Sequence, residues 1–185
     1  MNERKAFQRT DKAIMQALIR LLKAKRFEQI TVKDILAEAP VSRGTFYAHF
    51  QDKYEIAERM QEIYLSVVRK AVQDVRTMQP RAFGEFIRQI SEQQHDLGHA
   101  LLQIHTDQVD LLKHINKEMQ ELYLSLFSGE ADNPADLATE ARIFGSVIAM
   151  VHQEYMEGSI PLADGGIVIR AMGRVLMHMA HGDFR

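Results

Sequence analysis

Residues 31–53 constrain the fold of this 185-residue chain more than any other segment. Thr31, with Asp34 three residues later, forms a variant of the capping box that satisfies free amide groups at the start of a helix. Pro40 ends that helix, because proline has no amide hydrogen and pushes the preceding residue out of the helical region. The segment therefore opens with a short helix that stops at a defined turn.

A second short helix follows this turn, and its pattern shows which face points outward. Ser42 is a favourable N-cap for a helix that ends near Phe50. At about 100° per residue, Phe46 and Phe50 share one side, while Gly44 lies opposite. A face centred on small residues suits a surface that approaches another molecule closely. The two helices predict a helix-turn-helix and a DNA-binding protein; the alternative is a small surface helix with incidental charge.

The side chains around the outer face match the chemistry of DNA. Arg43 can reach guanine O6 and N7 or a phosphate, and Thr45 can meet a base edge or a thymine methyl group. Tyr47, His49 and Lys53 can donate to phosphates on either side, which fixes the register of a protein on DNA without reading its sequence.

The segment from Val41 to Phe50, followed by Asp52 and Lys53, closely resembles the recognition segment of TetR/AcrR-family transcriptional regulators. The resemblance covers residues 9 to about 60, and beyond them it is one of helical layout and length. It implies a homodimer on a double-stranded DNA operator, with a helical C-terminal domain that responds to a small molecule. The residues that fall where family members contact DNA are Thr31, Lys33, Ser42, Arg43, Gly44, Thr45, Tyr47, His49 and Lys53.

Pro40 departs from the family pattern, in which glycine usually occupies the turn. Because proline cannot adopt a positive φ, the turn requires another geometry, and this affects how the recognition helix docks on DNA.

The charge of the chain is divided unevenly along its length. Residues 1–55 hold eleven Lys and Arg against seven Asp and Glu, a balance of +4, whereas residues 56–185 hold twelve against eighteen, a balance of −6. Phosphate neutralisation requires the DNA-binding end to be the basic one. We predict a DNA-binding domain over residues 1–55 and an effector-binding and dimerisation domain over residues 56–185.

Composition excludes several classes of protein. The chain has no cysteine, so disulfides and thiolate metal sites are excluded. No apolar run approaches the roughly 20 residues that span a bilayer, and the charged start does not resemble a signal peptide. We expect a cytoplasmic protein without a membrane partner.

Apolar spacing predicts an all-α fold, with an N-terminal three-helix helix-turn-helix head on a larger helical body. The expected helices are residues 10–25, the two helices of the motif, a long helix from residue 52 to about residue 76, helices that begin near residues 80 and 98, and helices over 107–127, 134–157 and 167 to about 179. A break is expected at residues 96–98.

The last two of these helices are the expected dimer interface. Small residues such as Ala141 and Gly145 allow helices to approach closely, and two helices from each subunit would form a four-helix bundle. The alternative is that their apolar stripes form only intrachain core. The expected interface residues are Ala141, Gly145, Ile148, Val151, Tyr155, Val168, Met172, Val175, Leu176 and Met179.

The resemblance also implies an effector pocket among the middle helices, lined by apolar residues with a few polar groups. The candidates, each of which could instead be an ordinary core residue, are Phe83, Phe86, Ile90, Leu101, His105, Leu112, Tyr123, Phe127, Phe144 and Met150. His95 and His99 are spaced like metal ligands, but the expected break at Gly98 separates them, so we expect no metal and no cofactor.

The motif indicates a sequence-specific DNA-binding protein, and the family resemblance implies a ligand-responsive regulator of transcription. Family habit favours a repressor that a small molecule releases from a palindromic operator, and activation stays open. The alternatives are an architectural DNA-binding protein without an effector and a small helical enzyme. We expect no enzyme, because the sequence has no nucleophile elbow, no phosphate-binding glycine loop and no His-Glu-x-x-His motif.

Overall fold

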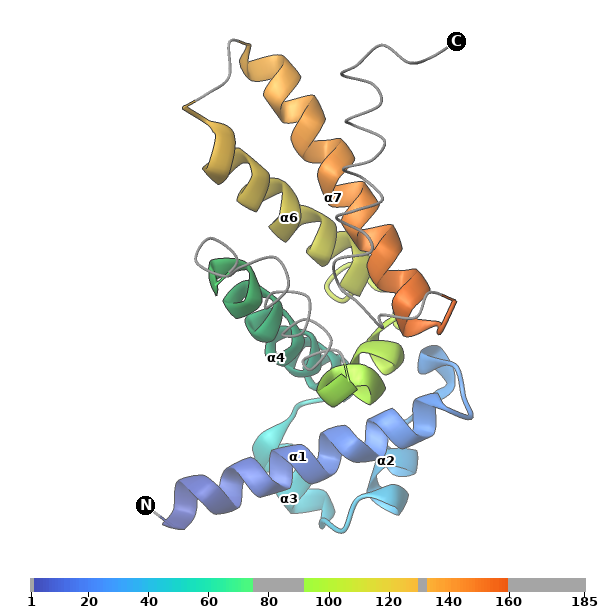
Figure 1. The fold of residues 1–185 in the computed structure, drawn as a ribbon. Coiled ribbons are helices and arrows are strands. Elements are labelled where there is room, and N and C mark those ends of the chain that lie inside the picture. The colour runs from blue at the N-terminus through green and yellow to red at the C-terminus, as the bar shows by residue number, and fades with distance from the viewer. Residues whose placement is uncertain (1, 75–91, 130–132, 160–185) are drawn as a thin grey trace. The chain divides into compact units, whose positions relative to one another are not determined.

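The computed structural model describes residues 2–74, 92–129 and 133–159, in which every regular element is a helix (Figure 1). The all-α prediction is therefore confirmed. The helices are α1 (Asn2–Leu22), the 3-10 turn η1 (Phe27–Gln29), α2 (Val32–Glu38), α3 (Arg43–His49), α4 (Lys53–Asp74), α6 (Leu111–Phe127) and α7 (Pro134–Met156). Residues 92–101 form a further helix. The helices expected near residue 80 and over 167–179 lie outside the described residues.

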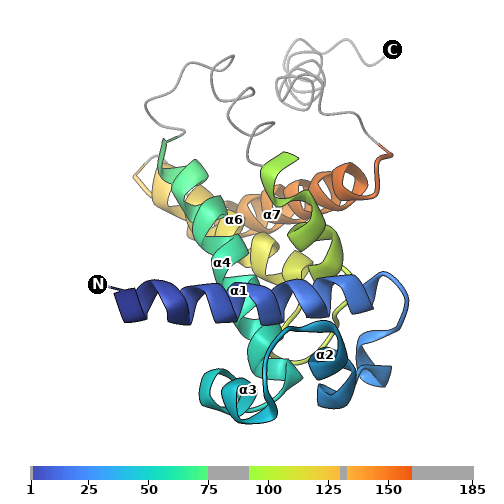
Figure 2. The same ribbon diagram turned by 90° about the horizontal axis from the view of Figure 1, so that it is seen from below.

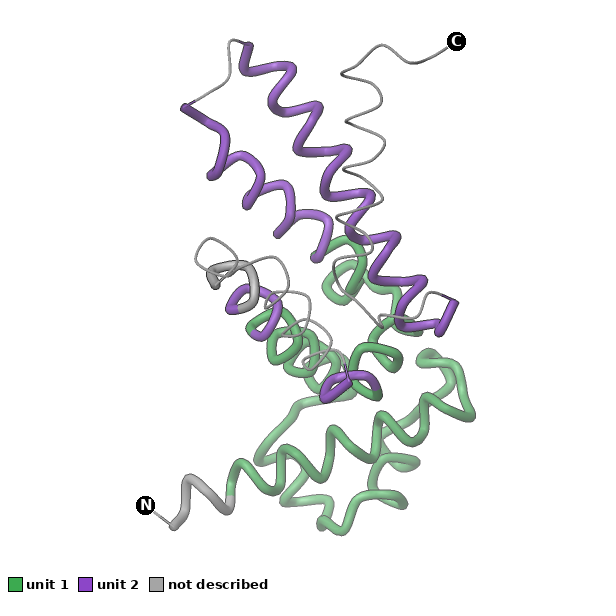
Figure 3. Tube along the Cα trace, viewed as in Figure 1, with its two compact units in different colours: residues 1–66, 96–114 green, residues 67–95, 115–185 purple. Residues whose placement is uncertain are grey.

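The chain divides into two compact units that do not follow the order of the sequence (Figure 3). Unit 1 comprises residues 1–66 and 96–114, and unit 2 comprises residues 67–95 and 115–185.

Unit 1 contains the helix-turn-helix, in which α1 packs against α2 and α3 (Figure 2). Its core includes Ile14 and Leu18 of α1, Ile35 of α2 and Phe46 of α3, all fully buried. Apolar burial of this kind holds two seven-residue helices that are too short to be stable alone.

Both ends of α2 are held by side chains. At its start, Thr31 and Asp34 form the expected capping box. Hydrogen bonds from Lys25 and from Thr31 hold the pKa of Asp34 well below its usual range. At its end, Nη2 of Arg20 donates to the carbonyl oxygen of Glu38 at 2.9 Å. The cation thus meets the free carbonyl groups at a helix C-terminus, where its charge is most favourable.

Pro40 is accommodated by a turn with no left-handed residue. Ala39 is extended, with φ −95° and ψ 136°, and the amide of Val41 donates to the carbonyl of Ala39 at 2.8 Å. This bond closes a three-residue γ-turn around Pro40, a geometry that the fixed φ of proline suits. A γ-turn at Pro40 therefore takes the place of the turn that glycine usually forms in this family.

The bounds of two helices differ from those expected, and one expected break is absent. Helix α1 begins at Asn2 rather than at residue 10, because polar residues with good helix propensity extend it beyond its apolar stripe, and it ends at Leu22 rather than at residue 25. Helix α6 begins at Leu111 rather than at residue 107, since Asp110 supplies the cap by accepting from the amide of Lys113 at 3.1 Å. The break expected at residues 96–98 is wrong, because Gly98 is tolerated inside a helix.

In unit 2, α6 and α7 approach each other closely. A Cβ atom added at Gly145 would lie 2.6 Å from the backbone oxygen of Asn116, and Asn116 donates to the hydroxyl of Ser146 at 3.2 Å. Farther along, Tyr123 donates to Glu140 at 3.0 Å, and burial together with this bond raises the pKa of Tyr123. Glycine at residue 145 is therefore required by packing within the chain.

Candidate nucleic-acid interface

Helix α3 presents its small and polar residues outward. Phe46 is fully buried and Phe50 is 5% exposed, whereas Arg43, Gly44 and Tyr47 are all exposed. The inner face anchors the helix in the core of unit 1, so its outer face is free to meet another molecule. This is the orientation that the aromatic spacing predicts.

The hydroxyl groups expected to contact DNA also cap the two helices of the motif. Ser42 accepts from the amide of Thr45 at 3.0 Å, and their two hydroxyl oxygens lie 2.8 Å apart. Thr31 donates to the carboxylate of Asp34 at 2.7 Å. Hydroxyl groups accept as well as donate, so these caps leave Thr31, Ser42 and Thr45 capacity for a further bond.

The charged and aromatic side chains of the outer surface form a second group. The guanidinium of Arg43 lies 5.7 Å from the centroid of the Tyr47 ring, and Tyr47 is 48% exposed. Lys33, on α2, is exposed as well. Stacking on a tyrosine orders an arginine while its N–H groups keep access to an acceptor.

Lys53 does not point toward the outer surface. Only 9% of the residue is exposed, and its ammonium donates to the carbonyl oxygens of Phe27 at 2.6 Å, Glu28 at 3.0 Å and Ile30 at 2.9 Å. An ammonium has three N–H groups, so these bonds use all of them. Burial lowers the pKa of Lys53 below its ordinary value, and the nearby carboxylates of Glu28 and Asp52 only partly oppose this shift. The structure thus gives Lys53 a place inside the head, unlike the phosphate contact that the resemblance implies.

His49, the last residue of α3, is also directed inward. Its Nδ1 atom lies 2.6 Å from the carboxylate of Asp11 on α1, and its side chain is only 8% exposed. Its ring stacks on Phe7, with centroids 3.8 Å apart. Sequence reasoning missed both partners, because they lie 38 or more residues away and the expected first helix did not reach residue 7. A signal was present, since Phe7 and Asp11 are spaced by one helical turn.

The expected effector-pocket residues separate into groups. Phe83, Phe86 and Ile90 lie outside the described residues. In unit 2, Tyr123 lies 4.7 Å from Phe127 and 5.3 Å from Phe144, measured between ring centroids, while Met150 is 57% exposed. In unit 1, Leu101 is fully buried, Leu112 is half-buried and His105 is exposed.

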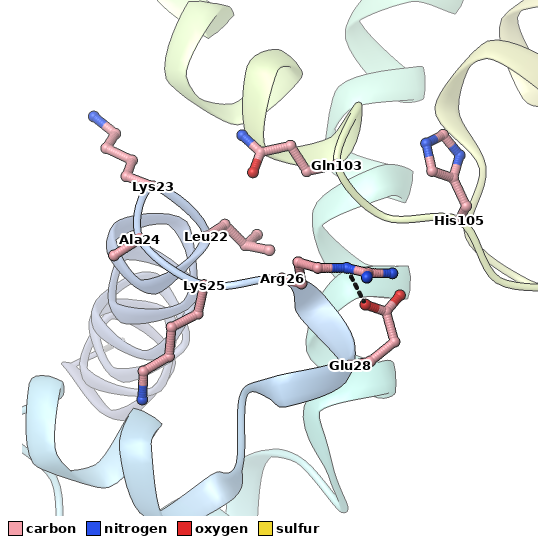
Figure 4. Close-up of a pocket in the computed structure, with 8 residues that line it drawn as sticks. All are labelled: Leu22, Lys23, Ala24, Lys25, Arg26, Glu28, Gln103 and His105. Atoms are coloured by element: carbon pink, nitrogen blue, oxygen red, sulfur yellow. Dashed lines mark ion pairs between the residues drawn. The ribbon is translucent and has the colours of Figure 1, made fainter.

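His105 also lines an open basic groove of about 490 Å³ within unit 1 (Figure 4). Its basic side chains have acidic partners: Arg26 lies 3.4 Å from Glu28, and His105 lies 3.6 Å from Asp110. Lys23 and Lys25 pair in the same way with Asp96 and Asp34. None of the other described pocket candidates lines this groove. The lining residues are Leu22, Lys23, Ala24, Lys25, Arg26, Glu28, Gln103 and His105.

The expected dimer residues on α7 have different surroundings. Ala141 is 1% exposed and Gly145 is buried against α6 of the same chain, whereas Ile148, Val151 and Tyr155 are half-buried. The remaining candidates, Val168, Met172, Val175, Leu176 and Met179, lie outside the described residues. The most exposed large apolar side chains of α7 are Ile143 at 60% and Met150 at 57%.

The part of the chain that the structure describes offers no metal-binding cluster and no helix suited to crossing a bilayer. No group of three or more His, Cys, Asp or Glu side chains there is arranged to hold a metal ion. None of the helices in residues 2–74, 92–129 and 133–159 has both the length and the apolar character that crossing a bilayer requires.

Comparison with known proteins shows that the helix-turn-helix matches a known family. Residues 14–60 match the model of "Bacterial regulatory proteins, tetR family". The chain is 38% identical over 61 residues to the HTH-type transcriptional regulator YxbF of Bacillus subtilis (strain 168). That match covers 33% of this chain and only 16% of the relative, about a sixth of its length.

Two solved structures share the fold over most of the chain. The dihydroxyacetone kinase operon activator DhaS aligns with a TM-score of 0.59 at 15% identity, over 91% of this chain and 95% of its own. A TetR transcriptional regulator from Streptococcus agalactiae 2603V aligns with a TM-score of 0.52 at 21% identity, over 84% and 96%. The helix-turn-helix over residues 14–60 thus matches that of the tetR family of bacterial regulatory proteins, and the chain shares the all-helical fold of these two structures.

Proposed function

We propose that this protein is a homodimer that binds a palindromic DNA operator and is released from it by a small molecule, so that it acts as a repressor. The observation that carries the proposal is the outer face of α3, where Arg43, Gly44 and Tyr47 are exposed and the aromatic anchors are buried. A face of this composition lets the helix backbone approach base edges in a major groove.

Within this proposal the DNA-facing residues have separate tasks. Arg43 and Thr45 read bases, and Lys33 and Tyr47 hold phosphates on either side. Gly44 admits the DNA backbone or base edges, while Thr31 and Ser42 contribute from the two helix caps. His49 and Lys53 act from inside the head, because Nδ1 of His49 and the ammonium of Lys53 are already engaged there.

The release step requires two head positions with different DNA affinities. Half-sites of a palindromic operator lie about 34–36 Å apart or multiples of that, so a small change in head separation prevents both heads from binding together. A ligand shifts this equilibrium only by its differential affinity for the two states. The Tyr123, Phe127 and Phe144 cluster supplies apolar surface for such a ligand.

Activation is the second candidate function, since DhaS, which shares the fold, is named an operon activator. A reporter gene under the protein's own upstream DNA separates the two. Repression predicts higher expression when the gene for this protein is deleted, and activation predicts lower expression.

The first experiment is binding of the purified protein to the DNA upstream of its gene, measured by fluorescence anisotropy at several salt concentrations against a scrambled duplex. Preference for the native duplex at two protomers per site supports the proposal. Arg43→Ala should cost about 1–3 kcal/mol and relax specificity at one base position in each half-site. Equal, salt-sensitive binding to both duplexes would instead favour the architectural alternative, and catalytic turnover with no DNA affinity would favour the enzyme.

A further inference from the structure

We propose that Asp11, through His49, is a positioning residue that holds the C-terminal end of the recognition helix α3 in the orientation that reads DNA. The inference rests on the proposed function, because it concerns how α3 meets an operator. It assigns His49 a task inside the protein instead of a direct phosphate contact.

The contact between these two side chains is short and shielded. His49 Nδ1 lies 2.6 Å from a carboxylate oxygen of Asp11, and the two side chains are only 8% and 17% exposed. An ionised carboxylate can only accept a hydrogen bond, so Nδ1 carries the proton that it donates. A hydrogen bond with a charged partner in a partly buried place is among the stronger ones in proteins.

Phe7 covers this contact from one side. Its ring stacks on His49 with an interplanar angle of 23° and a centroid distance of 3.8 Å, while half of Phe7 stays exposed. Phe7 and Asp11 are one turn apart in α1, so one face of that helix supplies both the acceptor and the stacking ring. The arrangement fixes the plane of the imidazole as well as its position.

The contact lies at the C-terminal end of α3, where it can restrain the orientation of this helix. The helix has only seven residues and is tied at its start by the cap of Ser42 and in its middle by buried Phe46. Its last residue is His49, so the bond to α1 adds a polar tie at the far end, next to buried Phe50. Without it, the end of α3 can tilt, and a small tilt moves Arg43 and Thr45 out of register with bases.

Electrostatics alone predicts that removing Asp11 strengthens operator binding, whereas a positioning role predicts that it weakens operator binding. The two effects have opposite signs, so the inference can be tested. Removing a carboxylate from a protein that binds a polyanion should strengthen binding to any duplex. If Asp11 positions α3, its removal should instead weaken binding to the operator while leaving binding to a scrambled duplex unchanged or stronger.

The test compares three variants that lose the same single charge. Asp11→Ala deletes the acceptor, Asp11→Asn keeps an amide oxygen that can accept from Nδ1, and Glu58→Ala removes an exposed carboxylate of α4 in the same unit. Operator and scrambled-duplex affinities of the full chain are measured by anisotropy, and the fraction folded is checked by urea titration.

We expect Asp11→Ala to reduce the ratio of operator to scrambled affinity by roughly tenfold, the size of one charge-assisted hydrogen bond. Asp11→Asn should restore most of this ratio, and Glu58→Ala should leave it unchanged. In nitrogen-15 NMR, the imidazole signal of His49 should shift in Asp11→Ala. Equal ratios in all three variants would overturn the inference.

The competing role for His49, a direct phosphate contact, gives a different pattern. It predicts that His49→Ala weakens binding to both duplexes and lowers the salt dependence, while Asp11→Ala does not weaken operator binding. Positioning predicts that the double variant Asp11→Ala/His49→Ala has an operator ratio close to that of either single variant. If the unaltered protein shows no operator preference, the proposed function fails, and that result is distinct from a failure of the positioning role.

Discussion

At the scale of single residues, Gly44 is a position where the needs of protein stability can be distinguished from those of DNA binding. A Cβ atom added at Gly44 would meet only the hydroxyl oxygen of Ser42, at 3.8 Å, which is an ordinary contact. The backbone there has no positive φ that would demand glycine. Glycine also weakens a helix, so neither packing nor conformation accounts for its presence in α3.

Gly44→Ala should therefore raise the free energy of unfolding, by up to about 1 kcal/mol, and weaken operator binding. The added methyl group lies where we propose that DNA approaches the helix backbone. Urea titration and anisotropy measure the two effects, and Gly129→Ala, a change in open surroundings, is the control with no effect on DNA. Unchanged operator affinity in Gly44→Ala would mean that this face does not approach DNA closely.

Lys53 and Lys33 should respond in opposite ways to the same substitution. Lys53→Met leaves three carbonyl oxygens without their donor, so the free energy of unfolding should fall by about 1–3 kcal/mol, while the salt slope of DNA binding stays unchanged. Lys33→Met should leave stability unchanged and reduce the salt slope by about one per protomer, because an exposed lysine can neutralise a phosphate. A reduced slope in Lys53→Met would restore the phosphate role that the resemblance implies.

At the scale of helices, local signals predicted most of the elements, and tertiary contacts decided the rest. The capping box of Thr31, the stop at Pro40 and the cap of Ser42 lie within a few residues of the boundaries that they set, so the sequence alone was sufficient for α2 and α3. Gly98 was read as a break, because glycine has poor helix propensity, yet the helix over 92–101 continues through it. Propensity is a weak signal at a buried position, where packing outweighs it.

The small residues of α7 are a second case: their spacing predicts a close helix contact but does not identify the helix that makes it. The spacing predicts close helix approach at Gly145 in a dimer interface, and the helix that lies against Gly145 in the structure is α6 of the same chain. Sequence spacing shows that a helix has a small-residue face, but it does not say which helix covers that face.

Gly145→Ala should consequently destabilise the protein, by about 1–3 kcal/mol, although alanine is the better helix former. The new Cβ atom would lie 2.6 Å from a backbone oxygen that cannot move without disturbing α6. Urea titration at several protein concentrations is the measurement. A loss of stability that is the same at every concentration indicates an intrachain clash, whereas a loss that grows on dilution would mean that Gly145 contacts a partner subunit.

At the scale of the whole molecule, the sequence could not supply the long-range contacts that complete the head. Unit 1 joins residues 1–66 to residues 96–114, and the bond between Asp11 and His49 spans 38 residues. Neither has a local signature, because any buried histidine can use any carboxylate that the fold brings near. The outward residues of the candidate site were predictable from helical periodicity, whereas the inward roles of His49 and Lys53 required coordinates.

In the function that we propose, operator binding depends on dimerisation of the whole molecule, and α7 offers a surface for it. Ile143 and Met150 are 60% and 57% exposed and are seven residues apart, so they share one face of the helix. Large apolar side chains exposed together on a helix favour contact with another protein surface. We expect this face to contribute to the homodimer that we propose.

The double variant Ile143→Glu/Met150→Glu should shift the protein from dimer to monomer in analytical ultracentrifugation, because it places charges in an apolar contact. Operator affinity should then fall by roughly 10²–10⁴-fold, the advantage of binding two linked half-sites, while affinity for a single half-site stays unchanged. Leu124→Glu on α6, at a side chain 37% exposed, is the matched control and should remain a dimer. If the control dissociates and the double variant does not, the dimer contact lies on α6, and the two heads must be spaced by that helix instead.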